Sequence, residues 1–327
     1  MSNELRNIWL FGCGYWAKIL VQKIHSIYPE SSIFVVDINQ KNLQHFVQTR
    51  PFCRASSKKE FLESVRSEDL CFIATPPNTH SELITLALSN NCHCWVEKPM
   101  TTSSIEALEL ISLAKKKQLT LFIDNTFLYD PLIQELKRAT LNSGTKKIYS
   151  RRQGWGRVLT DFGVLWDLLP HDLSIINNIF GKISSWKLQS MAFGPKDLQL
   201  DLTLVMATII FITETGFEVT VELSAISQSK VREIQIISDL GLTSYNLNQE
   251  GSQIIFTPWN LVPGVKLNGV NKRIEKFNVT DSLSNAIRRF DYLVSAKSLE
   301  HNIDYTISEI EIIEKLHSES LSWGGIE

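Results

Sequence analysis

The chain has 327 residues, of which 43% are hydrophobic and 21% are charged. This composition is typical of a folded protein and excludes a disordered one, and the length suggests about two domains. Lys and Arg together number 33 against 35 for Asp and Glu, so the formal charge is −2. Because no basic excess is present to hold a polyphosphate backbone, we expect no nucleic-acid partner.

The sequence also argues against a membrane protein and a disulfide-bonded one. Its longest nearly apolar stretch, residues 202–212, is shorter than the roughly 20 residues that cross a bilayer, and the N-terminus does not resemble a signal peptide. The 5 cysteines are odd in number, which does not favour a disulfide framework. Since alternate residues of a strand face opposite ways, His93 would point away from Cys92 and Cys94. We therefore predict a cytoplasmic protein with no membrane partner and no metal site.

The first 125 residues alternate short apolar runs with longer amphipathic segments. The apolar runs predict strands at residues 8–11, 32–36, 70–74, 92–96 and 119–123. Apolar residues at helical spacing predict helices at residues 16–27, 42–48, 58–65, 80–88 and 103–117. Alternation of this kind is typical of β-α-β units around a parallel sheet, so residues 1–124 are predicted to form a doubly wound α/β domain.

The pattern changes in the rest of the chain, residues 125–327. Helical spacing predicts helices at residues 132–141, 166–180, 281–297 and 306–318. Runs rich in β-branched residues predict strands at residues 202–212, 216–225, 231–238 and 242–247. Because Gly, Asn and Ser separate these runs, we expect an α+β domain built on a large, mainly antiparallel, open-faced sheet.

A glycine-rich turn follows the first predicted strand and opens the first predicted helix. Residues 12–17 read GCGYWA, which is the pattern G-x-G-x-x-A. Gly12 permits a tight turn, Gly14 lets a pyrophosphate approach the backbone, and the small Ala17 allows close packing of helix on strand. Asp37 ends the next strand, where a carboxylate would accept hydrogen bonds from ribose hydroxyls. These features predict a Rossmann dinucleotide-binding domain, against the alternative of a plain glycine turn and a capping aspartate.

Asp37 also bears on the choice of cofactor. A 2′-phosphate beside a carboxylate is repelled, and residues 38–40 contain no arginine to offset that repulsion. We therefore predict NAD in preference to NADP, and we interpret Lys41 as a surface residue at a helix start. Tyr15 and Trp16 are expected along the cofactor, although Trp16 fits a core position equally well.

Three further motifs occur in a fixed order after the glycine turn. Residues 74–80 (ATPPNTH) and 97–99 (EKP) each follow a predicted strand of the first sheet, and open α/β sheets bind ligands at the carboxyl ends of their strands. Residues 166–172 (WDLLPHD) carry a D-x-x-x-H pattern. Together these motifs resemble the Gfo/Idh/MocA oxidoreductase family over essentially the whole chain.

One branch of that family is similar in more detail. Residues 125–129, 152–157 and 163–167 look like the branch that acts on nucleotide-linked N-acetylated amino sugars. In that branch Gly-His precedes Thr-Phe-Leu-Tyr, whereas this chain has Asp124 and Asn125. The resemblance implies a final helix that packs back on the first domain. It also implies an oxidoreductase that transfers hydride between nicotinamide and a sugar secondary hydroxyl, C3 of a nucleotide-linked sugar such as UDP-N-acetylglucosamine.

Two other functions stay open beside this one. The family also includes dehydrogenases and reductases of a free sugar, polyol or sugar phosphate, and a non-catalytic NAD-binding sensor is a further alternative. The expected partner is thus a small-molecule sugar or nucleotide-sugar substrate. An exposed sheet face and its edges need covering, so we also predict a homo-oligomer, either a dimer or a tetramer.

The resemblance supplies three candidate catalytic residues. Lys98 is the family's lysine, whose ammonium would stabilise the developing alkoxide. His171 is the expected proton acceptor, because imidazole titrates near neutral pH. Asp167, one helical turn earlier, is assigned to orienting the substrate hydroxyls or His171, provided that Pro170 lies in the first turn of the helix. The competing interpretations are a surface lysine, a structural histidine and a helix N-cap.

The other candidate residues are assigned to binding. Those expected at the cofactor are Gly12, Gly14, Tyr15, Trp16, Ala17, Asp37, Thr75, Pro76, Pro77, His80, Glu97 and Lys98. Those expected at the substrate are Lys98, Asn125, Arg157, Trp166, Asp167 and His171. Two of these have equally weighted alternatives, because His80 fits a brace for the 76–77 turn and Arg157 fits a surface charge.

Overall fold

A computed structural model describes residues 6–141, 144–155, 163–194, 203–247, 253–258, 273–276, 281–298 and 303–323. The chain divides into two compact units, each of which takes in two stretches of sequence. The first unit comprises Met1–Thr126 and Leu283–Glu311, and the second comprises Phe127–Ser282 and Ile312–Glu327. Arg157, a predicted substrate-binding residue, lies outside the described residues.

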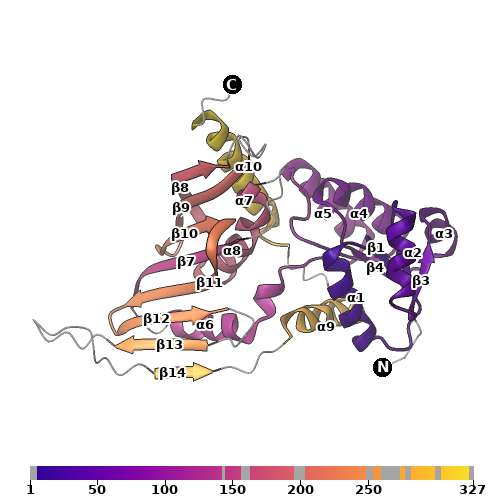
Figure 1. Ribbon diagram of the computed structural model, residues 1–327, viewed down its shortest axis with the longest axis horizontal. Coiled ribbons are helices and arrows are strands. Elements are labelled where there is room, and N and C mark those ends of the chain that lie inside the picture. The colour runs from indigo at the N-terminus through magenta and orange to yellow at the C-terminus, as the bar shows by residue number, and fades with distance from the viewer. Residues whose placement is uncertain are drawn as a thin grey trace, which may run out of the picture. The chain divides into compact units, whose positions relative to one another are not determined.

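The first unit is built on a six-stranded sheet in the order β3-β2-β1-β4-β5-β6, in which every neighbouring pair is parallel (Figure 1). Its strands are β1 (Ile8–Phe11), β2 (Ile33–Val36), β3 (Cys53–Ser56), β4 (Leu70–Ile73), β5 (His93–Val96) and β6 (Leu121–Ile123). Its connecting helices are α1 (Tyr15–Ile27), α2 (Gln40–Gln48), α3 (Lys58–Ser64), η1 (Pro77–Thr79), α4 (His80–Ser89) and α5 (Ser104–Lys117). This strand order, which reverses at β1, is that of a dinucleotide-binding Rossmann fold, so the predicted fold class is confirmed.

The two central strands explain why the sequence alternates as it does. Every residue of β1 and of β4 is buried, as expected when helices cover both faces of a parallel sheet. The edge strand β3 was not predicted, because Arg54 and Ala55 at its centre are exposed and leave no apolar run. Edge strands of this kind show little hydrophobic signal, and their polar residues hinder pairing with another chain.

A helix from far along the chain completes the core of this unit. In α9 (Ser282–Ser295), the fully buried ring of Phe290 packs against the rings of Phe72, Trp95 and Phe122. The centroid distances are 5.7, 5.8 and 5.6 Å, within the range of favourable aromatic pairs. The first unit is therefore closed by residues that lie more than half the chain away in sequence.

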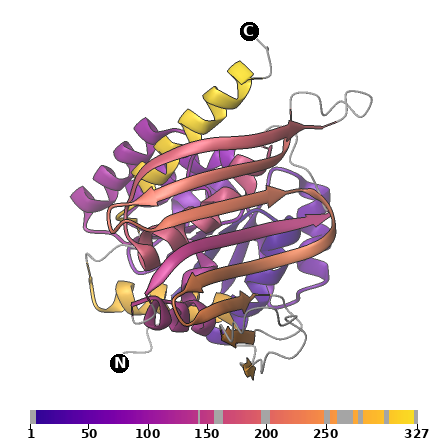
Figure 2. The ribbon, with the colours of Figure 1, turned by 90° about the vertical axis from the view of Figure 1, so that its left-hand side faces the viewer.

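The second unit is built on an eight-stranded sheet in the order β14-β13-β12-β11-β7-β10-β9-β8 (Figure 2). Only β7 and β10 pair in parallel among these strands, so the predicted mainly antiparallel sheet is confirmed. The strands are β7 (Thr145–Trp155), β8 (Ile183–Phe193), β9 (Leu204–Thr213), β10 (Glu218–Ser224), β11 (Ile226–Ser238), β12 (Gly241–Asn246), β13 (Gln253–Pro258) and β14 (Arg273–Lys276). The helices of this unit are α6 (Pro131–Leu141), α7 (Gly163–Asp167), α8 (Leu169–Ile175) and the π-helix η3 (Ile176–Phe180). The division between the units falls within η2 (Thr126–Tyr129), after Thr126, and within α10 (Thr306–Trp323), after Glu311.

The two faces of the large sheet differ in character. Buried residues such as Ile209 and Phe211 on β9 and Ile236 on β11 alternate with partly exposed neighbours along their strands. No helix lies in front of the sheet face that Figure 2 presents. Across the strands of this sheet, ion pairs join Lys147 to Glu218 and Arg151 to Glu233. One face thus packs on helices and the other is open, as predicted.

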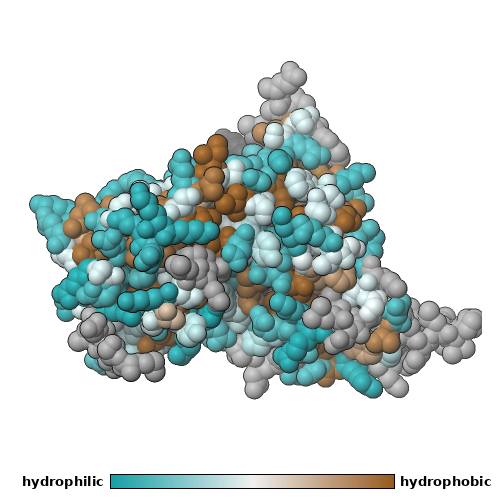
Figure 3. Space-filling model, turned by 180° about the vertical axis from the view of Figure 1, so that it is seen from behind, coloured by the Kyte–Doolittle hydropathy of each residue, from teal (hydrophilic) through white to brown (hydrophobic). Residues whose placement is uncertain are grey.

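Several sequence expectations concern what the fold holds or lacks. All five cysteines are buried free thiols. Within the described ranges, no helix is long and apolar enough to cross a membrane. In the same ranges, no group of three or more His, Cys, Asp or Glu side chains is placed to hold a metal ion. On the face that Figure 3 presents, hydrophilic and hydrophobic side chains are intermixed.

Candidate functional site

The glycine turn between β1 and α1 has the geometry that a pyrophosphate requires. Gly12 has a φ of +102°, and a Cβ at this position would lie 2.5 Å from the Ala74 carbonyl oxygen, so a side chain is excluded. At Gly14 a Cβ would meet no atom within 4 Å, so the space beside the turn is open. Gly14 is also the N-cap of α1 and carries no side chain that could cover the N–H groups of the first turn. Backbone donors and a positive helix end are thus available to an anion, and this chain fits a dinucleotide here.

Asp37 is fixed against the glycine turn by backbone donors. Its Oδ2 accepts a hydrogen bond from the Cys13 N–H at 2.9 Å, and its Oδ1 accepts one from the Asn39 N–H at 2.7 Å. These two hydrogen bonds hold the carboxylate in place. Each of its oxygens can still accept a further hydrogen bond. Of the neighbouring predicted residues, Tyr15 is exposed and Trp16 is half-buried, while Ala17 lies in the core.

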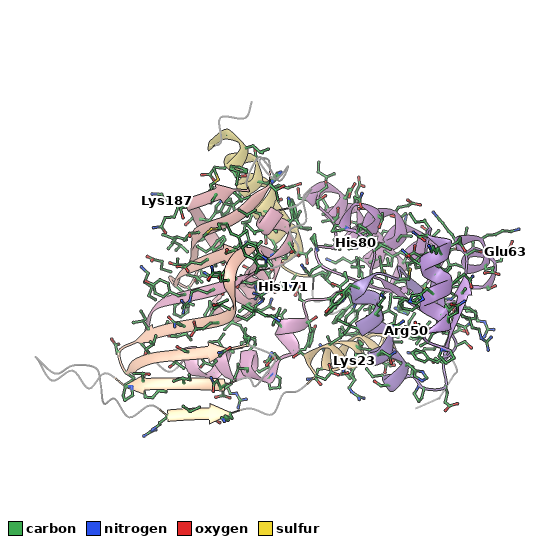
Figure 4. The ribbon with its side chains drawn as sticks, viewed as in Figure 1. Lys23, Arg50, Glu63, His80, His171 and Lys187 are labelled. Atoms are coloured by element: carbon green, nitrogen blue, oxygen red, sulfur yellow. The ribbon has the colours of Figure 1, made fainter. Side chains whose placement is uncertain are left out.

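His80 connects the two loops that follow β4 and β5. The ring is fully buried, with Nδ1 2.9 Å from the Pro99 carbonyl oxygen and Nε2 2.8 Å from the Thr75 carbonyl oxygen (Figure 4). Burial lowers the pKa of His80, and the carbonyl acceptors oppose that change. The geometry is that of a brace between the loops. Pro76 is exposed and Pro77 is half-buried in the first of them.

Lys98 follows β5, at the same carboxyl edge of the sheet as the glycine turn. The side chain is half-buried, and its charge acts on the carboxyl groups of Glu97 and Asp124. Those two carboxyl groups are hydrogen-bonded to each other, and Thr126 donates its hydroxyl to Asp124. Asn125, a predicted substrate-binding residue, is buried immediately after this pair.

The D-x-x-x-H motif lies in the second unit on two short helices. Asp167 is the last residue of α7, and Leu168 is the N-cap of α8, which holds His171. The expectation that Asp167 and His171 share one continuous helix is therefore wrong, and Leu168, not Asp167, occupies the N-cap position. Pro170 lies at the start of α8, as predicted, where its missing N–H costs no hydrogen bond. The Trp166 side chain is only 5% exposed and packs within this unit.

An aromatic ring and a buried ion pair surround His171. The Phe127 ring meets the imidazole edge-on at a centroid distance of 5.0 Å, and the Arg152 guanidinium lies 4.6 Å from the centroid of the same ring. Arg152 donates from Nε to Asp172 Oδ2 at 2.8 Å, and Ser150 donates to Asp172 Oδ1 at 2.6 Å. Asp172 directly follows His171, so this ion pair fixes the helix that carries the imidazole.

A second arginine contributes to the same cluster. Arg232 on β11 is in register with Arg152 on β7. Burial and the positive charge of Arg152 lower the pKa of Arg232 to about 10, while the negative charges of Asp172 and Asp167 oppose the change. The sequence analysis did not single out Arg152, Asp172 or Arg232. Arg152 and Asp172 lie in the motif stretches at residues 152–157 and 166–172, which could have indicated them, and the spacing of Ser150 and Arg152 on one strand face was a further signal.

The fold and the turn at residues 12–17 define a Rossmann-type dinucleotide-binding unit joined to an α+β unit. Residues 6–125 match the profile of the Gfo/Idh/MocA proteins, which is described as an oxidoreductase family with an NAD-binding Rossmann fold. The N-terminal part of the chain is thus similar to the NAD-binding Rossmann domain of that oxidoreductase family.

Among curated proteins, a UDP-N-acetylglucosamine 3-dehydrogenase of Acidithiobacillus ferrooxidans is 28% identical over 166 residues, which are 51% of each chain. The oxidoreductase YrbE of Bacillus subtilis, whose reaction is uncharacterised, is 26% identical over 181 residues, which are 53% of each chain. The chain thus aligns with about half the length of these relatives.

Solved structures show the same fold over nearly the whole chain. The structure of the Acidithiobacillus ferrooxidans UDP-N-acetylglucosamine 3-dehydrogenase GnnA superposes with a TM-score of 0.78 at 22% identity, covering 94% of this chain and 95% of that one. The 3-ketoreductase KijD10 of Actinomadura kijaniata, solved with NADP and TDP-benzene, superposes with a TM-score of 0.78 at 14% identity, covering 95% of this chain and 96% of that one. At these identities the likeness establishes the fold.

Proposed function

We propose that the protein is an NAD-dependent oxidoreductase that transfers hydride between nicotinamide and a sugar secondary hydroxyl. The proposed reacting position is C3 of a nucleotide-linked N-acetylated amino sugar such as UDP-N-acetylglucosamine. The observation that carries this proposal is the open glycine turn at Gly12 and Gly14, with Lys98 at the same carboxyl edge of the sheet. The curated and structural relatives that act on nucleotide-linked sugars support the substrate class.

Three residues carry the chemistry in this proposal. Nicotinamide, when bound, supplies the hydride acceptor or donor. Lys98 presents an ammonium that stabilises negative charge on the reacting oxygen. His171 takes the hydroxyl proton, because imidazole titrates near neutral pH. Asp167 orients the substrate hydroxyls, and its charge already acts on Arg232 in the same unit.

Binding roles follow the positions described for the first unit. The turn at Gly12, Gly14 and Ala17 holds the pyrophosphate, and Asp37 accepts hydrogen bonds from the adenosine ribose. The loop residues after β4 and β5 form the wall beside the nicotinamide, with His80 bracing that wall from within. Asn125 and Trp166 are both buried. In this proposal they shape the substrate site.

The substrate class is tested by turnover with a panel of compounds. NADH absorbance is followed with UDP-N-acetylglucosamine, related nucleotide sugars, free sugars, polyols and sugar phosphates. We expect turnover with the nucleotide-linked amino sugar and at least tenfold lower kcat/KM for the other classes, because a buried site built for a group rejects compounds that lack it. Preferred turnover of a free sugar or polyol would overturn the substrate assignment. NAD binding without turnover of any compound would indicate a sensor.

Cofactor preference gives a prediction at Asp37. In the Asp37→Asn variant, the ratio of kcat/KM for NAD to that for NADP should fall by about tenfold or more. The carboxylate charge that repels a 2′-phosphate is removed. The amide oxygen can still accept the Cys13 N–H, although the amide NH2 cannot replace the oxygen that accepts the Asn39 N–H. The exposed Glu30→Gln variant serves as the control and should leave the ratio unchanged. An unchanged ratio in Asp37→Asn would contradict the assignment of NAD.

The open sheet of the second unit supports the proposal of a homo-oligomer. Trp155 is 76% exposed and lies opposite the exposed Ile226 across the pair of β7 and β11. The exposed Met206 is in register with Ser224, two residues before Ile226, so apolar side chains gather at one end of the sheet. A second copy of the chain would cover such a patch.

Light scattering tests the oligomer directly. At micromolar concentration, the wild-type protein should have the mass of a dimer or tetramer. The Trp155→Glu variant should shift the equilibrium toward the monomer, because it places a charge in an apolar interface. Ile105→Glu, at an exposed position on α5 in the first unit, provides the matched control. A monomeric wild-type protein would refute the proposal.

A further inference from the structure

The sheet register places two carboxyl groups side by side next to Lys98. β5 and β6 pair in parallel with Val96 in register with Ile123, so the next residues, Glu97 and Asp124, leave the sheet together. The backbone continues this register, because the Asp124 N–H donates to the Val96 carbonyl at 2.8 Å. Residues that are far apart in the sequence thereby present two acidic side chains at one point of the carboxyl edge.

The Asp124 side chain and one oxygen of the Glu97 carboxyl group are shielded from water. Asp124 is 1% exposed, and although Glu97 as a residue is half-buried, its Oε1 atom is fully covered. Neither Glu97 Oε1 nor Asp124 Oδ2 receives an N–H or ordinary hydroxyl donor from any residue that the structure describes. Among the residues that the structure describes, the hydrogen available to these two oxygens is a carboxyl proton that one group donates to the other.

Burial and mutual repulsion favour a proton on this pair of carboxyl groups. Burial raises the pKa of Glu97 well above its ordinary value, and the negative charge of Asp124 raises it further. Burial also raises the pKa of Asp124, but hydrogen bonds from Glu97 and Thr126 favour its charged form. Two buried carboxylates in contact cannot both ionise, so the pair keeps one proton. The Thr126 hydroxyl, which donates to Asp124, favours the arrangement in which Glu97 holds the proton and donates it to Asp124.

We propose that Glu97 and Asp124 share one proton at neutral pH and that the single negative charge of the pair is a fixed counter-charge that positions Lys98. This role deepens the proposed function, because Lys98 is the residue that would meet the reacting oxygen. The charged groups acting on the pair are its two members and Lys98. His80 Nδ1 lies 2.9 Å from the Pro99 carbonyl oxygen, and His80 is not among the groups that act on the pair.

The shared proton predicts a specific dependence of stability on pH. In the unfolded chain Glu97 loses its proton near pH 4.3, whereas the folded protein keeps it. The folded state therefore binds one more proton than the unfolded state, and its folding equilibrium constant falls about tenfold for each pH unit above that value. The Glu97→Gln variant has no such proton. The ratio of its folding equilibrium constant to that of the wild-type protein should therefore rise about tenfold per pH unit between pH 5 and 8.

Urea unfolding at several pH values measures this difference without any substrate. The matched control is Glu63→Gln, at an exposed position on α3, whose stability relative to wild type should not depend on pH in this range. Asp124→Asn is the second variant, in which the amide donates to an ionised Glu97, and the pH dependence should be lost there too. If Glu97→Gln does not fold, infrared spectroscopy at pH 8 gives the same information. The wild-type protein should show the band of a protonated carboxyl group, and the Asp124→Asn variant should not. A pH-independent difference and no such band would overturn the shared proton.

The positioning role is read from kinetics. Glu97→Gln should keep a kcat about tenfold or more above that of Glu97→Ala, because its amide still donates to Asp124. The double variant Glu97→Gln/Asp124→Asn, which has lost the negative charge, should fall in kcat by about tenfold or more with a smaller change in KM for NAD. An unchanged kcat in the double variant would overturn the positioning role. A wild-type protein without turnover would contradict the proposed function and this role together, while the shared proton is still decided by the unfolding measurements.

Discussion

Replacing Lys98 with Met should lower kcat by about 10²–10³ while leaving the Kd for NAD within a few-fold of the wild-type value. The reason is that removing one preorganised donor to a developing oxyanion typically costs that factor. The proposed pyrophosphate contacts come instead from the glycine turn after β1, which β4 separates from β5 in the sheet. Single-turnover absorbance of NADH measures the rate, and titration calorimetry measures NAD binding. Lys59→Met, at a position where the side chain is 82% exposed on α3, is the matched control.

A double-variant cycle extends this experiment to His171. If Lys98 and His171 act on the same step, the double variant Lys98→Met/His171→Ala should be little slower than the slower single variant, because groups that act as a unit show strongly non-additive effects. Additive losses would show that the two residues serve separate steps. Undiminished turnover in Lys98→Met would contradict the assignment of this lysine altogether.

The largest effect on stability is expected at Asp172. The Asp172→Ala variant should lose about 3–5 kcal/mol of unfolding free energy, because it leaves the buried guanidinium of Arg152 without its counter-charge. Arg152 is 3% exposed, and its Nη1 has no hydrogen-bond acceptor among the residues described. The positive charge of Arg232, in register on the neighbouring strand, adds to the cost. Urea denaturation followed by circular dichroism measures the change.

Two comparisons separate the buried ion pair from salt bridges in general. Glu214→Ala breaks the exposed pair with Lys182 in the same unit and should cost less than about 1 kcal/mol. The double variant Arg152→Met/Asp172→Leu should regain most of the loss, because apolar side chains of similar volume replace buried ion pairs at little cost. An Asp172→Ala variant as stable as Glu214→Ala would contradict this account.

The sequence predicts most of the first unit because its central strands β1 and β4 are apolar throughout. Residues 8–11 and 70–73 are buried on both faces of the sheet, so each forms a continuous apolar run that predicts a strand. The glycine turn directly follows the first of these runs. The exposed centre of β3 gives no such signal. Tertiary packing decides its pairing with β2, and a single sequence contains no trace of that packing.

The second unit is less predictable for a physical reason. β7 places Ser150 and Arg152 on the buried side, where the pattern of a strand requires apolar residues. A partner from a distant helix, Asp172, makes these polar residues suitable for the core. The break at Leu168 between α7 and α8 likewise depends on local geometry that helical spacing does not reveal. The pairing of Glu97 with Asp124 follows only once the strand order is known.

The packing of Phe290 has a consequence for synthesis of the protein. The aromatic surface formed by Phe72, Trp95 and Phe122 is complete once β6 has formed, yet the ring that covers it belongs to α9. During translation this surface stays uncovered until the ribosome has made most of the chain. The nascent N-terminal unit would therefore expose a hydrophobic aromatic surface, of the kind that chaperones bind, until α9 packs against it.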